Sequence, residues 1–245
     1  THQTLTLKLG INFKNMAIEF YNRNWRVPSS WNGTEDNNNK VSNYSMSFDG
    51  AGEYIDCGNI PALQNASVIT WNLWVNFNSA NFNIVFGKDL VGTTDGIQFY
   101  TWASGVGYFW LKTASTSVTA SISSFIGGLV NTGDWNMFTI VFDGSETGND
   151  RLKIYLNGGA SNIITGYSGT VPATLPNTTD EFYIGKGLNG DFDGKIDHLS
   201  IFDYALTDGT GGTTNQIAEL YGSSSTGVGN PMAITNGRKP VAYYP

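Results

Sequence analysis

Hydrophobic and polar residues alternate along much of this chain with a period of two. In residues 68–78, VITWNLWVNFN, apolar side chains at every second position from Ile69 to Phe77 alternate with Thr70, three asparagines and Trp74. This pattern predicts a half-buried β-strand, with one face toward a core and the other toward solvent.

Shorter segments with the same character predict further strands. They cover residues 44–48, 83–87, 96–102, 106–113, 137–142, 151–156, 181–185 and 195–202. Clusters rich in Gly, Asn and Asp separate them, and these residues favour turns. Many short strands joined by turns, without helices between them, predict an all-β fold: an antiparallel sandwich of two sheets.

One short helix is expected near the end of this strand-rich region, in TTNQIAELYG at 213–222. Thr213 or Thr214 would cap its N-terminus, and Gly222 would end it. Three of its residues would face the sheet: Ile217, Leu220 and Tyr221.

The chain divides into three segments on this interpretation. Residues 1–40 form an N-terminal arm and connecting loop, 41–222 the sandwich domain, and 223–245 a Gly/Ser-rich tail with a terminal strand. Residues 222–237 have the composition of a flexible linker. The final KPVAYYP is expected either to pair with the domain or to begin a neighbouring module.

The tripeptide Phe-Asp-Gly occurs three times, at 48–50, 142–144 and 192–194. The intervals between the copies are unequal, which argues against an internal repeat. Asp-Gly supplies turn chemistry, because the carboxylate accepts backbone N–H groups and glycine tolerates positive φ. We therefore predict three strand ends built alike, with each phenylalanine anchored in the core.

Composition narrows the classes of function. Only 13% of the 245 residues are charged and the net charge is −7, so the chain lacks the basic face that nucleic-acid binding needs. No apolar run is long enough to span a bilayer. Cys57 is the only cysteine and is expected to be a small buried hydrophobe, and the chain starts Thr-His-Gln, as a processed or excised piece would.

Three stretches resemble laminin G-like modules with the concanavalin A-like fold. YSMSFDGAGEYIDCGN is similar to their first strand, and DWNMFTIVFDG followed by RLKIYLNG to their central hairpin. EFYIGKGLNGDFDGKIDHLSIFDYALT, followed by IAELYG, resembles their closing segment. Together they cover about residues 44–222. The resemblance implies a jelly roll with one convex and one concave sheet, in a family whose members bind glycans or proteins, accompany glycoside hydrolases, or serve in virions and adhesins.

The chain departs from the family pattern in two places. A Gly-rich insertion, DGTGG at 208–212, precedes the helix, and the first forty residues match nothing in the family. A strand such as VAYYP would normally precede the first Phe-Asp-Gly, but here it stands at 241–245. The missing strand is expected from residues 1–13, from MAIEFY at 16–21, or from the tail itself.

A catalytic site is the hypothesis that the residues favour least. Glycosidases use two carboxylates about 5–10 Å apart, which glucanases of this fold place as Glu-x-Asp-x-x-Glu on one strand. The nearest segment, Glu53-Tyr-Ile-Asp56, has a different spacing, and His198 is the only histidine inside the domain and is expected at the surface. We therefore predict that the chain is not an enzyme.

A structural calcium ion is a second candidate. Such an ion often occurs in concanavalin-like domains, and by position Asp197 matches the aspartate that holds it, with the carbonyl of Gly50 or Ala51 as a further ligand. Oxygen ligands of this kind suit Ca²⁺. The alternative is that Asp197 is a carboxylate bonded to backbone N–H groups at a strand end.

The third candidate is a glycan-binding face on the predicted strands 96–102 and 106–113. If the two pair, one face of the hairpin carries Ile, Phe and Leu, and the other carries Gln98, Tyr100, Trp102, Tyr108, Trp110 and Lys112. Aromatic rings beside hydrogen-bonding groups suit sugar recognition. Alternatively, residues 22–43 or a neighbouring subunit cover these rings.

The resulting functional hypothesis is a non-catalytic module, extracellular or on a virion surface, that binds a glycan or glycoprotein through an aromatic concave face. The alternative is a structural, decoration or fibre module of a virion or surface appendage, whose partners would be other copies of itself or virion proteins. Low charge, the arm and the tail motivate this alternative. Neither hypothesis involves nucleic acid or membrane insertion.

Overall fold

A computed structural model describes residues 12–14, 17–20, 44–88, 95–188, 190–223 and 227–245. The strands are β1 Asn12–Lys14, β2 Ala17–Phe20, β3 Tyr44–Asp49, β4 Tyr54–Asp56, β5 Val68–Phe77, β6 Asn83–Lys88, β7 Gly96–Trp102, β8 Val106–Lys112, β9 Ser117–Ile122, β10 Trp135–Asp143, β11 Leu152–Leu156, β12 Gly166–Tyr167, β13 Phe182–Ile184, β14 Lys186–Gly187, β15 Gly190–Asp191, β16 Asp193–Phe202 and β17 Ala242–Tyr244. The helices are α1 Gln216–Tyr221 and four 3₁₀ turns: η2 Pro61–Leu63, η3 Gly148–Arg151, η4 Thr210–Gly212 and η5 Pro231–Ala233.

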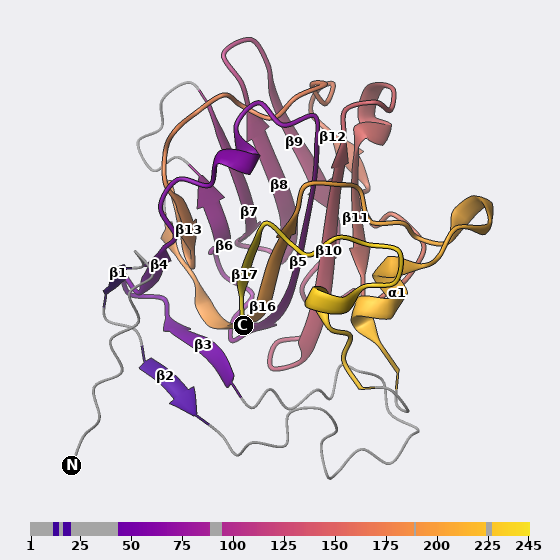
Figure 1. Ribbon diagram of the computed structural model, residues 1–245. Helices are drawn as coiled ribbons and strands as arrows, with labels where there is room; N and C mark the ends of the chain where they lie inside the picture. The colour runs from indigo at the N-terminus through magenta and orange to yellow at the C-terminus, as the bar shows by residue number, and fades with distance from the viewer. Residues whose placement is uncertain (1–11, 15–16, 21–43, 89–94, 189, 224–226) are drawn as a thin grey trace.

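Two antiparallel sheets form the sandwich (Figure 1). The eight-stranded sheet has the order β1-β4-β13-β6-β7-β8-β9-β12. The seven-stranded sheet has the order β11-β10-β5-β16-β3-β2, with β17 also paired to β16. The predicted all-β two-sheet sandwich is confirmed, and each strand expected from the pattern is present with its ends shifted by at most two residues.

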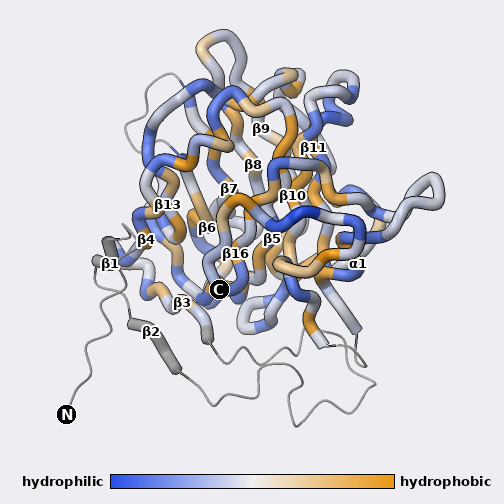
Figure 2. The backbone as a smooth tube through the Cα atoms, in the orientation of Figure 1, coloured by the Kyte–Doolittle hydropathy of each residue, from blue (hydrophilic) through white to orange (hydrophobic). Residues whose placement is uncertain are grey.

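The core lies between the inward faces of the two sheets. Trp71 of β5 packs at 5.9 Å from the ring of Phe86 and 5.7 Å from that of Phe109, both on the opposite sheet. Figure 2 shows hydrophobic residues concentrated in the strands, with polar residues mostly in the connections. Such interdigitation of two inward faces is the usual core of an aligned β-sandwich.

A second hydrophobic layer covers the outward face of the seven-stranded sheet. Ile217 and Leu220 of α1 pack with Trp74 and Met137, and the ring of Tyr221 stacks on Trp74 at 5.5 Å. The prediction that β5 is half-buried is therefore wrong, because its outward residues are buried as well. The buried polar side chains of β5 are hydrogen-bonded. For example, Thr70 Oγ1 donates to the Tyr204 carbonyl at 2.8 Å.

The helix has the predicted inward face but a different cap. Asn215, rather than Thr213 or Thr214, accepts the N–H of Ala218 through its side chain. Gly222 ends the helix at φ 77°, as predicted. Among described helices, none has the length and apolar character needed to cross a membrane.

The region between α1 and the last strand is packed rather than linker-like. Ile234 is buried in the second layer, and the Gly229 N–H donates to the Leu220 carbonyl. The linker prediction is wrong for residues 227–237. Beyond them, β17 pairs with β16, so KPVAYYP returns to the domain. Residues 17–20 also join this sheet, beside β3.

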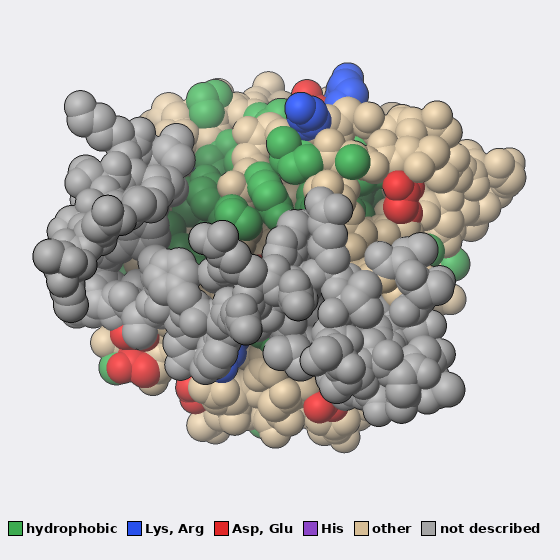
Figure 3. Space-filling view, turned by 60° about the horizontal axis from the view of Figure 1, so that its bottom comes forward, with side chains coloured by type: hydrophobic (Ala, Val, Ile, Leu, Met, Phe, Trp, Pro, Cys, Tyr) green, Lys and Arg blue, Asp and Glu red, His purple; other side chains and the backbone are tan. Residues whose placement is uncertain are grey.

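The surface reflects the low charge of the sequence. On the face shown in Figure 3, Lys, Arg, Asp and Glu side chains are sparse among the described residues, and several hydrophobic side chains are visible together.

The Phe-Asp-Gly copies share a buried phenylalanine but not one turn. Phe48, Phe142 and Phe192 are all buried. Asp49 and Asp143 each accept the N–H two residues ahead, at 2.9 Å. The third copy differs, because Phe192 precedes β16 instead of ending a strand. The prediction of three strand ends built alike therefore holds for two copies only.

Gly144→Val should strongly destabilise the fold. A Cβ at Gly144 would collide with the carbonyl oxygen of Ala173, which is backbone and has little freedom to move. We expect a loss of about 3 kcal/mol or more in the free energy of unfolding, measured by urea denaturation. Asp143→Asn is the control, because an amide oxygen also accepts the Ser145 N–H, and it should change stability by less than about 0.5 kcal/mol. Equal effects of the two substitutions would contradict this explanation.

Candidate functional site

The predicted binding residues lie on a regular hairpin of β7 and β8. Gln98 pairs with Trp110 and Tyr100 with Tyr108, while Phe99 pairs with Phe109 on the alternate face. Phe99 and Phe109 are fully buried in the core. Because side chains alternate across a strand, the tyrosines and Trp110 are held on the outward face of the eight-stranded sheet.

Four aromatic residues of the hairpin share this face with a fifth that the sequence pattern missed. Phe82, just before β6, meets Trp102 edge-on at 4.9 Å and Tyr100 at 6.0 Å. Tyr100 stacks on Tyr108 at 5.2 Å. We call Phe82, Tyr100, Trp102, Tyr108 and Trp110 the aromatic platform. Phe82 stands outside the strand alternation, so the sequence pattern gives no sign of its place, which its ring contacts and its packing over Gly190 reveal.

The platform is partly exposed. Trp102 is 53% exposed, a large fraction for an indole, and Tyr100, Tyr108 and Trp110 are intermediate. Burial, and then the neighbouring Tyr108, raise the pKa of Tyr100, so its hydroxyl stays a neutral donor and acceptor at physiological pH. Residues 22–43, which were expected as an alternative cover for these rings, lie outside the described residues.

Polar side chains border the platform on β9. Thr119 pairs with Trp110, Ser121 with Tyr108 and Ser117 with Lys112. The row next to the aromatic rings thus offers three hydroxyls, and Lys112 of β8 adds one ammonium. This combination can hydrogen-bond a polar ligand whose flat face rests on the rings.

Gln98 belongs to the same face but is not available to a ligand. It is only 6% exposed, and its Nε2 is buried without a hydrogen-bond partner among the residues that the structure describes. The short hairpin of β14 and β15 lies over it: a Cβ on Gly187 would stand 3.1 Å from Gln98 Nε2. Of the six predicted residues, Gln98 therefore lies beneath the hairpin, while the remaining five are at least partly exposed.

The predicted metal ligands are not brought together. Asp193 pairs with Asp49, next to Gly50, whereas Asp197 lies beyond Ile196, which pairs with Met46. Asp197 and the Gly50–Ala51 turn are thus separated by several residues along β16, at about 3.3 Å each. Asp197 is fully buried and its Oδ1 lies 2.6 Å from His198 Nδ1. In the described residues, no three His, Cys, Asp or Glu side chains form a metal-binding group.

The strand register therefore separates Asp197 from Gly50 along β16, and the calcium ion stays a prediction. His198, expected at the surface, is largely covered, with a side chain 16% exposed. It takes positive φ, 53°, at the bulge where β16 shifts register against β5.

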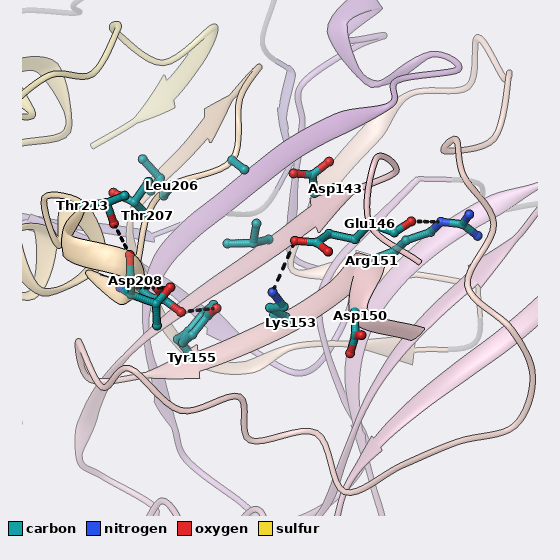
Figure 4. Close-up of a pocket in the computed structure, with 13 residues that line it drawn as sticks. Asp143, Glu146, Asp150, Arg151, Lys153, Tyr155, Leu206, Thr207, Asp208 and Thr213 are labelled. Carbon is teal, nitrogen blue, oxygen red and sulfur yellow. Dashed lines mark hydrogen bonds and ion pairs between the residues drawn. The ribbon is translucent and has the colours of Figure 1, made fainter. Parts of the chain in front are cut away.

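A cleft lies elsewhere, over the outward side of β10 and β11 (Figure 4). It has a volume of about 170 Å³, and its floor includes Val141 and the stem of Lys153. Asp208 and Thr210 of the DGTGG insertion form one wall, and Glu146 stands on the other side. The sequence marked this insertion as unusual but gave no reason to place it at a cleft.

Hydrogen bonds fix the wall that the insertion contributes. Asp208 Oδ1 accepts the N–H and hydroxyl of Thr210, and Asp208 Oδ2 accepts the Tyr155 hydroxyl at 3.0 Å. Burial by itself would raise the pKa of Asp208, but these bonds outweigh it and lower the pKa overall. Burial and the bond to Asp208 raise the pKa of Tyr155. The neutral hydroxyl of Tyr155 thus donates a hydrogen bond to the ionised carboxylate of Asp208.

Comparison with known proteins shows which family this architecture belongs to. The family described as the concanavalin A-like lectin/glucanases superfamily matches residues 49–210. No curated protein sequence matches the chain.

Several solved structures share the fold. Domain 4 of AbnA, a GH43 extracellular arabinanase from Geobacillus stearothermophilus, in complex with arabinotriose, is 19% identical, with a TM-score of 0.54 over 75% of this chain and 79% of that one. The CBM40 of a Ruminococcus gnavus sialidase bound to α2,3-sialyllactose is 15% identical, with a TM-score of 0.52 over 67% and 92%. A SAP-like pentraxin from Limulus polyphemus is 15% identical, with a TM-score of 0.50 over 82% and 90%. At these identities the likeness shows the fold.

Tyr155→Phe tests the wall of the cleft. Loss of the hydroxyl should cost about 1 kcal/mol of unfolding free energy at neutral pH. The lowered pKa of Asp208 means that its ionised form stabilises the fold, and this contribution is lost as the pH falls through the folded-state pKa. The difference between wild type and variant should therefore shrink below about pH 4, measured by urea denaturation across pH.

Tyr167→Phe is the matched control, because its hydroxyl donates to a carbonyl, that of Leu152 at 2.9 Å, instead of a carboxylate. It should cost a similar free energy that does not shrink as the pH falls below about 4. A pH-independent effect of Tyr155→Phe would show that Asp208 is not stabilised by this bond.

Proposed function

Because the chain belongs to the concanavalin A-like lectin/glucanase superfamily, we propose that it is a non-catalytic module that binds glycans through the aromatic platform. The observation that carries the proposal is the gathering of five aromatic side chains, one of them 53% exposed, on one outward sheet face. Rings stack on the apolar faces of sugars, and the adjacent hydroxyls satisfy sugar hydroxyls.

The composition of this face supports binding over catalysis. The outward positions of β7 and β8 carry glutamine, tyrosine, tryptophan and lysine, and none carries a carboxylate. A glycosidase would need two carboxylates on either side of the scissile bond. The partner is accordingly a glycan or a glycosylated protein, which the site binds without cleaving it.

Two of the structures that share the fold carry a bound oligosaccharide: arabinotriose in one, and α2,3-sialyllactose in the other. The first belongs to an extracellular enzyme. These likenesses support an extracellular setting for the present module, where glycans are abundant. Its sparsely charged surface, rich in amide and hydroxyl side chains, fits such a setting.

A binding experiment on the platform tests this function. The intact chain should bind at least one group of structures on a broad glycan array. Tyr100→Ala and Trp110→Ala should each weaken binding to the best ligand about tenfold, or about 1.4 kcal/mol, measured by titration calorimetry. The loss follows from removing a ring surface that stacks on the sugar.

Met232→Ala is the control, because Met232 is 39% exposed in η5, which belongs to the layer on the other sheet. It should leave affinity unchanged. Absence of binding on the array, or unchanged affinity in both platform variants while they remain folded, would disprove the proposal.

A structural role in a virion or surface appendage is the second candidate. The observation that favours it is the seating of residues 242–244 in the seven-stranded sheet, through contacts that another copy could also provide. In this role the partners would be proteins rather than glycans. It does not exclude the first.

A further inference from the structure

The last strand occupies a slot made entirely by distant parts of the chain. β17 pairs only with β16 among the described strands, at Leu199, Ser200 and Ile201. On the same edge of β16, residues 193–196 pair with β3. β17 therefore fills the part of this edge that β3 leaves open.

Side chains make the slot specific for this segment. Tyr244 packs against the hydrophobic core and shares a hydrogen bond with the thiol of Cys57. Burial, the largest effect, raises the pKa of Cys57 to about 12, so the thiol stays protonated. On the outward face, the Tyr243 ring meets His198 edge-on at 5.9 Å.

A short hinge separates the strand from the packed region before it. Arg238 is held by the Tyr204 hydroxyl, which donates to its carbonyl at 2.9 Å, and by an ion pair with Asp203. Val241 already donates its N–H to Ile201. Only Lys239 and Pro240 lie between them, and a residue before proline favours extended backbone. Lys239 and Pro240 are therefore the residues whose backbone would have to change direction for the strand to leave its own domain while Arg238 keeps its contacts.

From this arrangement we infer that the slot is an exchange site: it accepts residues 241–245 of a second copy of this chain, in place of its own. The donated segment makes the same backbone pairs, the same Tyr244–Cys57 bond and the same Tyr243–His198 contact. A second copy is the fitting occupant because these contacts require the sequence Val-Ala-Tyr-Tyr at this register. Reciprocal exchange gives a closed two-fold dimer.

Concentration decides which occupant the slot takes. In the wild-type chain the tethered strand has an effective concentration of about millimolar, so the monomer dominates at micromolar protein. A shorter hinge removes this advantage, since Arg238 and Val241 become neighbours only about 3.8 Å apart between Cα atoms. Exchange is independent of the glycan-binding function, because the platform lies on the other sheet.

Deletion of Lys239 and Pro240 tests the inference in the full chain. We expect this variant to sediment as a dimer at micromolar concentration, where wild type is a monomer. Cys57, the only cysteine, reports whether the slot is filled. Its reaction with a thiol reagent should stay as slow in the dimer as in wild type, and should be about tenfold faster in Tyr244→Ala, which empties this part of the slot.

Each outcome decides the matter. A folded monomer would overturn the inference, whether its Cys57 reacts fast or slowly, as would a dimer with fast Cys57, which would use another surface. If the deletion does not fold, mixing two full-length variants decides instead. Tyr244→Ala leaves a weakened strand and an open slot, and Cys57→Trp fills the slot and frees the strand. A one-to-one complex of these two, absent when the second also carries Tyr244→Ala, supports exchange, and its absence overturns it.

Discussion

Packing of the two inward sheet faces against each other is the constraint on which the rest of this structure depends. Trp71 bridges the sheets through Phe86 and Phe109, and Phe99 contacts Phe138 across the same interface at 5.5 Å. The indole N–H of Trp71 is buried without a partner, which costs about 1–3 kcal/mol. That such a cost is tolerated indicates how strongly the packing of this ring stabilises the core.

This constraint also fixes the candidate site. Once Phe99 and Phe109 are committed to the core, the residues next to each of them on its strand must project outward, because strand side chains alternate. Tyr100, Tyr108 and Trp110 are therefore aligned by the packing on the opposite face of their own strands. The platform is rigid for the same reason, and a rigid aromatic surface loses little conformational entropy when a ligand binds.

The two sheets use their outward faces differently. On the seven-stranded sheet, α1 and the segment around Ile234 add a second apolar layer, so even the polar residues of β5 are buried and bonded. On the eight-stranded sheet, the outward face carries the platform, and the β14–β15 hairpin covers only the part near Gln98. The close approach of this hairpin requires Gly87, where a Cβ would lie 3.0 Å from the Lys186 carbonyl. Recognition and structural support are thus assigned to opposite sides of the sandwich.

The sequence by itself determined the strands, the two-sheet class and the pairing of β7 with β8, because period-two alternation and turn residues are local signals. It also placed all six predicted residues of that hairpin on the outward face, and five of them are at least partly exposed. Only the tertiary structure decided that Gln98 is covered, that Phe82 joins the platform and that Asp197 lies far from Gly50. Those facts depend on which distant segments lie side by side, through a hairpin over β6 or a register along β16. The small residues of β9 (Val118, Ala120 and Ile122 inward) gave too weak a pattern to predict their strand, and the burial of β5 on both faces required α1, which is more than 130 residues away. Contacts between remote segments leave no period in the sequence, so only the folded chain shows them.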